Sequence, residues 1–188
     1  RQVNEGAVEW PPSPWRILRA LIATWHLKGR DLAGPDALEE LIDQLAGSPP
    51  VFRLPDAVDM HTRHYMPLYR TDKNKTSKIF DAFVQTEKGA ELFVLWPEIS
   101  LAPDYRDLLE GLVGRIGYLG RAESWVEGSV LDEARAAQTV PNATFDETEG
   151  TAEHPTTTMG LLPPITPGEF KQWRPGQVER HTERIMAE

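Results

Sequence analysis

The pattern of hydrophobic and polar positions predicts two helices near the start of the chain. Ser13 and Pro14 are typical of a helix start, because serine caps free N–H groups and proline loses no hydrogen bond at the first helical position. Apolar residues then recur at helical spacing, which predicts a helix over 14–28 that ends near Gly29. A second apolar stripe predicts a helix over 35–46.

Farther along, the spacing changes to one that favours strands. The stretches KIFDAFVQT (78–86) and AELFVLWP (90–97) are separated by a short turn, which predicts a β-hairpin between them. Residues 101–113 predict a further helix, and SWVEGSVL (124–131) predicts a further strand. VDMHTRHYMPLYR (58–70) carries β-forming residues, but their alternation is irregular.

The order of these elements favours one fold class. A ferredoxin-like fold runs strand, helix, strand, strand, helix, strand, so residues 1–131 predict an α+β, ferredoxin-like (RRM-related) domain whose first strand is truncated. Residues 1–10, or chain lost ahead of them, would supply that strand. Residues 132–166 are acidic and rich in proline and threonine, which predicts a mobile linker or flap. Residues 167–188 predict a last helix that is polar on most faces.

Composition excludes several classes of protein. The 188 residues are 40% hydrophobic and 26% charged, which is typical of one globular domain with a tail. The chain has no cysteine, so a disulfide scaffold and thiolate chemistry are excluded. No apolar run reaches the ~18 residues that a membrane-spanning helix needs, and no signal-peptide pattern is present. We therefore expect a cytoplasmic protein with no membrane partner.

The net charge of −9 is unevenly distributed. Residues 53–78 hold six Lys and Arg against three acids, a net of +3, whereas residues 132–188 hold five against ten, a net of −5. The first segment, called here the basic island, is either a solvated loop or a surface that binds phosphates. The cations that would bind phosphate there are Arg63, Lys73, Lys75 and Lys78.

Two histidines in the basic island, His61 and His64, suggest chemistry. A zinc site is unsupported, because a separation of three in an extended segment places the imidazoles on opposite faces, and no third ligand is near. We expect no metal and no other cofactor. Either histidine would suit a general base, and His64 beside Arg63 would equally suit a phosphate.

The stretch GYLGRAESW (117–125) is a glycine-rich turn. Its glycines would let the backbone approach a ligand, with Arg121 binding a phosphate. The structural alternative is a tight connection in which Arg121 pairs with Glu123. Tyr118 and Arg121 repeat an interleaving of aromatic and cationic residues that is typical of proteins binding single-stranded RNA, although six tryptophans equally suit a core. The chain has neither GxGxxG nor a P-loop, which leaves nucleotide triphosphate hydrolysis without support.

Four stretches together resemble one protein family. They are VNEGAVEWPPSPWRILRAL, HTRHYMPL, KIFDAFV and YLGRAESWVE. They are similar to the Csb family of type I-G (formerly I-U) CRISPR systems, a RAMP family in which a Cas-five-like half is fused to a Cas-six-like half. The resemblance covers residues 1–131, and EWPPSPWR and YLGRAESW are its most specific motifs. The chain departs from the family in lacking the opening strand and in being too short for a complete second half.

The resemblance implies an RNA-binding subunit with a ferredoxin-like fold. Such a subunit would hold the 5′ handle of the CRISPR RNA in an effector complex, beside backbone and large subunits. The residues expected at the RNA are Arg16, Arg19, Arg63, His64, Tyr65, Lys73, Lys75, Lys78, Tyr118 and Arg121.

Three alternatives stay open. In the first, the chain is a metal-independent endoribonuclease that processes precursor CRISPR RNA with His61 or His64 as base, although the resemblance implies that this activity lies mainly in the Cas-six-like half. In the second, the chain is an adaptor whose acidic residues 132–188 contact a basic subunit. At the proline-rich junction, Glu9 would pair with Arg16 or Arg19 as a brace, in place of RNA contact.

Overall fold

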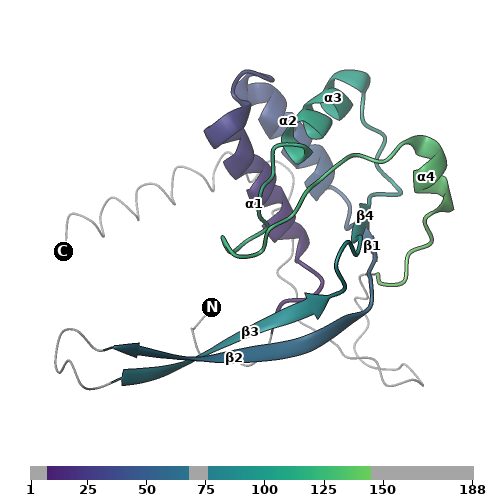
Figure 1. The fold of residues 1–188 in the computed structure, drawn as a ribbon. Coiled ribbons are helices and arrows are strands. Elements are labelled where there is room, and N and C mark those ends of the chain that lie inside the picture. Colours follow the sequence, from purple (N-terminus) through teal and green to yellow (C-terminus); the bar gives the residue numbers. More distant parts are fainter. Residues whose placement is uncertain (1–7, 68–75, 145–188) are drawn as a thin grey trace, which may run out of the picture.

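The computed structural model describes residues 8–67 and 76–144, and Figure 1 shows their arrangement. The elements in chain order are α1 (Pro14–Thr24), the π-helical turn η1 (Trp25–Gly29), α2 (Pro35–Ala46), β1 (Val51–Arg53), β2 (Ala57–Pro67), β3 (Thr76–Thr86), β4 (Phe93–Leu95), α3 (Pro103–Val113) and α4 (Glu133–Gln138). Helices and strands are both present, so the α+β class predicted from the sequence is confirmed.

Helices α1, α2 and α3 enclose the hydrophobic core, and the three helices predicted in these regions are confirmed. Each helix is amphipathic, so its apolar stripe has to be buried against its neighbours. The core residues are Leu18, Leu21, Ile22, Trp25, Leu38, Leu41, Ile42, Leu45, Ala46, Leu108 and Leu112. The three helices lie together at the top of Figure 1.

The start of α1 follows the predicted capping chemistry. Pro14 is the first helical residue, and the backbone N–H of Arg16 donates to Ser13 Oγ at 3.3 Å. Gly29 ends η1, which continues directly from α1. A Cβ on Gly29 would lie 2.8 Å from Cδ2 of Leu112, so glycine lets α3 pack closely there. The first helical segment is therefore held in place at both ends.

The described strands form two separate antiparallel pairs. In one, β1 pairs with β4, with Val51 opposite Leu95. In the other, β2 pairs with β3 over eleven residues each, from Ala57 opposite Thr86 onward. This second pair, called here the long hairpin, lies beneath the helices in Figure 1.

The predicted hairpin between 78–86 and 90–97 is wrong, because neither segment pairs with the other. β3 pairs with β2, which offers a ladder along its whole length, and β4 pairs with the short β1. Phe52 of β1 is 2% exposed, so this small pair lies against the buried interior. Burial of β1 and the length of β2 decide the pairing, rather than the shortest connecting turn.

The predicted strand over 124–131 is also wrong. The only strand-like contact there is an isolated bridge between Tyr118 and Trp125, as far as the described residues go. Farther along, a Cβ on Gly128 would lie 2.7 Å from Cγ1 and 2.8 Å from the carbonyl oxygen of Val113. This part of the chain therefore packs on the end of α3, where the described residues offer no strand edge to pair with it.

The later part of the chain returns to β1. The side chain of Asp132 caps α4 by accepting from the backbone N–H of Arg135 at 2.7 Å. Residue Ala143 then forms a bridge with Phe52 of β1. The predicted helix over 167–188, and most of the predicted linker, lie outside the described residues.

A candidate nucleic-acid interface beside helix α1

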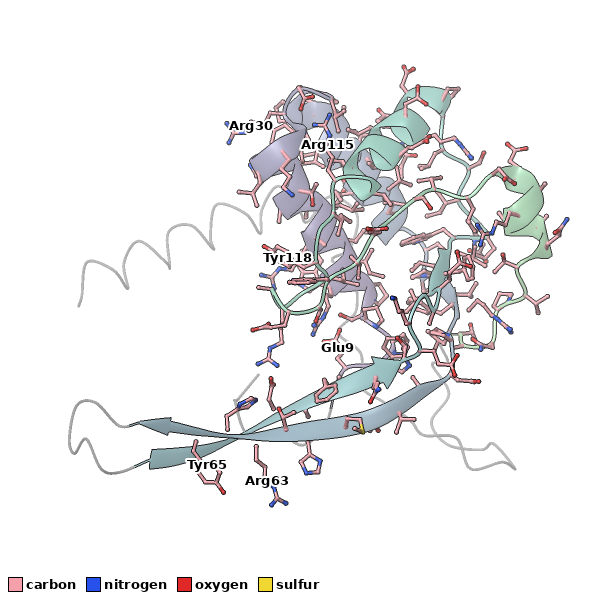
Figure 2. All side chains as sticks on the ribbon, viewed as in Figure 1. Glu9, Arg30, Arg63, Tyr65, Arg115 and Tyr118 are labelled. Carbon is pink, nitrogen blue, oxygen red and sulfur yellow. The ribbon has the colours of Figure 1, made fainter. Side chains whose placement is uncertain are left out.

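A concave surface of about 410 Å³ lies between α1 and residues 115–120, and we call it the cationic groove. Its lining includes Glu9, Arg16, Arg19, Lys28, Arg115 and Tyr118. Glu9, Tyr118 and Arg115 follow one another along this side of the molecule in Figure 2. Both of the most specific sequence motifs, EWPPSPWR and YLGRAESW, contribute to this one surface.

The groove is positive although the chain as a whole carries a net charge of −9. Four cationic side chains line it, against one carboxylate, that of Glu9. Like charges gathered in a concave surface focus their field and attract anions. Sequence reasoning found Arg16 and Arg19 but missed Lys28 and Arg115, which lie 87 residues apart and meet only in the folded chain.

Glu9 pairs with Arg16, so the predicted alternative of a brace at the junction is confirmed for Arg16. Oε1 of Glu9 accepts from the backbone N–H of Ser13 at 2.7 Å and from Nε of Arg16 at 3.2 Å, and Oε2 pairs with the guanidinium. Burial raises the pKa of Glu9, but the hydrogen bonds from Arg16 and Ser13 outweigh burial and lower that pKa. The carboxylate of Glu9 therefore partly neutralises the positive charge that Arg16 contributes to the groove.

The glycine turn packs directly on this pair. Gly120 has φ +86°, and a Cβ there would lie 2.5 Å from Nη1 of Arg16. Gly117 differs, because a Cβ there would have no heavy atom within 4 Å among the described residues. The prediction that both glycines give a ligand access to the backbone is therefore narrowed to Gly117, since Arg16 occupies the space beside Gly120.

The remaining cations of the groove differ in how they are paired. The side chain of Arg19 lies exposed on α1 and makes no hydrogen bond or ion pair within the described ranges. Lys28 is exposed, and its Nζ donates to the carbonyl oxygen of Arg115 at a long 3.4 Å. Arg115 forms a double hydrogen bond with Asp31, at 2.6 and 3.0 Å, which raises the pKa of Arg115 and lowers that of Asp31.

Arg121 connects the glycine turn to the long hairpin. Its guanidinium pairs with Asp81 of β3, and this hydrogen bond raises the pKa of Arg121. Asp81, rather than the predicted Glu123, is thus its hydrogen-bonded partner, and Glu123 contributes only a weaker charge interaction. Half of the Arg121 side chain, 48%, stays exposed.

The long hairpin divides the predicted cluster of Arg63, His64 and Tyr65 between two faces. Thr62 lies opposite Asp81, so both are on the face that meets Arg121. His64 shares this face, because its Nε2 lies 2.9 Å from Oγ1 of Thr62. Arg63 and Tyr65 point away from the helices (Figure 2).

His61 and His64 lie on opposite faces of β2, as the sequence predicted, because they are three residues apart in a strand. Within residues 8–67 and 76–144, no group of three His, Cys, Asp or Glu side chains could hold a metal ion. Lys73 and Lys75 lie outside the described residues, and the backbone of Lys78 lies opposite Tyr65 in the long hairpin. The adaptor alternative concerns residues 132–188, most of which lie outside them too.

No protein-family model, no curated protein and no solved structure matches this chain. In the part of the chain that the structure describes, no helix is long and apolar enough to cross a membrane.

Proposed function

We propose that this chain binds RNA in the cationic groove, and that it does so as the subunit holding the 5′ handle of CRISPR RNA in an effector complex. The observation that supports the proposal is the gathering of four cationic side chains beside the exposed ring of Tyr118. Cations bind the phosphates of a nucleic acid, and exposed aromatic rings stack on its bases. The resemblance of both groove-lining motifs to the Csb family supports the handle as ligand. The ferredoxin-like, RRM-related fold of that family is part of the same proposal.

The cations of the groove have different roles in this proposal. Arg19 and Lys28 contact phosphates, because both are exposed and neither is paired with a carboxylate in the described residues. Arg16 and Arg115 mainly hold the walls of the groove in position, because Glu9 and Asp31 already neutralise them.

The first test is the dependence of RNA affinity on salt. Binding of a labelled single-stranded CRISPR repeat RNA is measured by fluorescence anisotropy at several salt concentrations. Arg19→Ala and Lys28→Ala should each weaken binding and reduce the slope of log K against log salt by about 0.7, the value for one phosphate contact on a single strand. Lys88→Ala is the matched control, because Lys88 is an exposed cation between β3 and β4, away from the groove. Equal slopes for Arg19→Ala and Lys88→Ala would contradict the proposal.

A second test blocks the groove without removing charge. Gly117→Val places a side chain in the groove where the described residues leave open space. RNA affinity should fall while the midpoint of thermal unfolding stays unchanged. The handle itself is tested by competition, in which unlabelled handle RNA should displace the labelled RNA better than a scrambled sequence of equal length.

A second candidate function is metal-independent cleavage of precursor RNA, and the position of His64 favours it. His64 lies on the hairpin face that carries Asp81, the partner of Arg121, so a base and a cation share one side. Attack by a 2′-hydroxyl needs a group that takes its proton and a cation that stabilises the phosphorane charge. Precursor RNA incubated with the chain in EDTA should then be cut, His64→Ala should abolish the cut, and His61→Ala, on the opposite face, should leave it. Persistence of the cut in His64→Ala would exclude this histidine as the base.

A further inference from the structure

Trp125 exposes 85% of its surface, more than any other large hydrophobic side chain in the described residues. Tryptophan is usually well covered, because its indole is one of the largest apolar surfaces a side chain can bury. The structure offers this ring no covering partner among the residues it describes. Its neighbour across the turn, Tyr118, is also 48% exposed. One exposed and one half-exposed aromatic side chain thus lie on one short turn.

The backbone of the turn holds these two residues in register. The N–H of Leu119 donates to the carbonyl of Ser124 at 2.9 Å, and the N–H of Val126 donates to that of Gly117 at 3.3 Å. These bonds flank the bridge between Tyr118 and Trp125, so the two form a non-hydrogen-bonded antiparallel pair. Side chains of such a pair emerge on the same side and close together.

This aromatic pair lies at the rim of the cationic groove. Tyr118 and Gly117 line the groove. Gly117 and Trp125 also line an adjoining open hollow of about 510 Å³. The two hollows therefore meet at Gly117, with cations on one side and the indole on the other.

We propose that Tyr118 and Trp125 form a platform on which unpaired bases stack, so that the groove takes single-stranded rather than duplex RNA. This inference rests on the proposed function, because the cations of the groove would hold the phosphates of the same strand. Bases of an A-form duplex are stacked within the helix and cannot lie on a protein ring, whereas bases of a single strand can be splayed out. The cations that line the groove with Tyr118 favour a nucleotide as the ligand, because they bind its phosphate, whereas an apolar side chain of a protein partner carries no negative charge for them to bind.

The test compares three probes: a short single-stranded oligouridine, an abasic ribose-phosphate oligomer of the same length, and a blunt RNA duplex. The abasic oligomer keeps the phosphate charge and removes the bases. Wild-type protein should bind the oligouridine about 5- to 150-fold more tightly than the abasic oligomer, which is the range for stacking one base on an aromatic side chain. It should bind the duplex no more tightly than the abasic oligomer.

Substitution of the platform should remove this preference. Trp125→Ala should bring oligouridine affinity toward the abasic level and leave abasic affinity unchanged, and Trp125→Phe should retain part of the preference. Val140→Ala is the matched control, because Val140 is an exposed apolar residue, at 71%, that lines neither hollow. Circular dichroism should show that each variant stays folded, since the side chains of Trp125 and Val140 are both exposed.

The outcomes separate the two proposals. If wild-type protein binds the oligouridine and the abasic oligomer equally, RNA binding by the cationic groove stands and base stacking is refuted. If wild-type protein binds neither probe at low salt, the proposed function itself fails. If Trp125→Ala leaves the preference for oligouridine intact but abolishes association with another protein, the ring is a protein contact and the platform is refuted.

Discussion

The replacement of Gly120 with alanine tests the contact between the glycine turn and α1. The residue has φ +86°, where a side chain is strained, and its Cβ would lie 2.5 Å from Nη1 and 3.1 Å from Cδ of Arg16. Relief of this overlap requires the end of the Arg16 side chain to shift, and Glu9 holds the same guanidinium. The substitution therefore combines backbone strain with a weakened ion pair.

The two effects can be given rough magnitudes. A side chain at strained positive φ costs about 1–3 kcal/mol. The hydrogen bonds between Glu9 and Arg16 join side chains that are 22% and 29% exposed, so weakening them adds roughly 1 kcal/mol. Gly120→Ala should then lower the free energy of unfolding by about 2–4 kcal/mol, which lowers Tm by about 4–16 °C in a chain of this size.

Thermal unfolding followed by circular dichroism measures this loss. Gly117→Ala is the control in the same turn, where a Cβ meets open space, and it should change the free energy of unfolding by less than about 0.5 kcal/mol. In an Arg16→Ala background, Gly120→Ala should cost only the backbone strain, so the two substitutions should be coupled. The reasoning is refuted if Gly120→Ala is as mild as Gly117→Ala, or if its cost is the same with and without the Arg16 side chain.

Three further predictions concern the paired carboxylates and the buried side chain of Phe52. The folded state lowers the pKa of Glu9 and Asp31, so the stability that their ionised forms contribute should be complete above the ordinary carboxyl range and decrease as the pH drops below about 4.5. Urea unfolding across pH should show a shallower decrease for Glu9→Gln. Asp81→Asn removes the carboxylate that pairs with Arg121, so RNA should bind more tightly in anisotropy assays, and unchanged affinity would mean that Arg121 does not reach the RNA. Phe52→Ala removes a side chain that is 2% exposed, and urea unfolding should show a loss of about 3–5 kcal/mol.

The sequence by itself determined the helices. Ser13 and Pro14 specify where α1 begins, and Pro35 begins α2, because capping depends only on the residues of the first turn. The apolar stripes then determine which face of each helix is buried. The same local reasoning predicted that His61 and His64 point to opposite sides of β2.

The tertiary structure alone decided the strand partners and the composition of the groove. β3 pairs with β2 rather than with the segment across the shorter turn, because a strand's partner depends on the length and burial of distant neighbours. Lys28 and Arg115 meet across 87 residues, and Asp81 reaches Arg121 across 40. Which cations are neutralised depends on the distance to a carboxylate, since ion pairing falls off with separation. Packing sets that distance. The sequence could therefore identify Arg16, Arg19 and Arg121 as candidates for RNA contact. Only the fold shows that, of these three, Arg19 is the one without a carboxylate partner among the described residues.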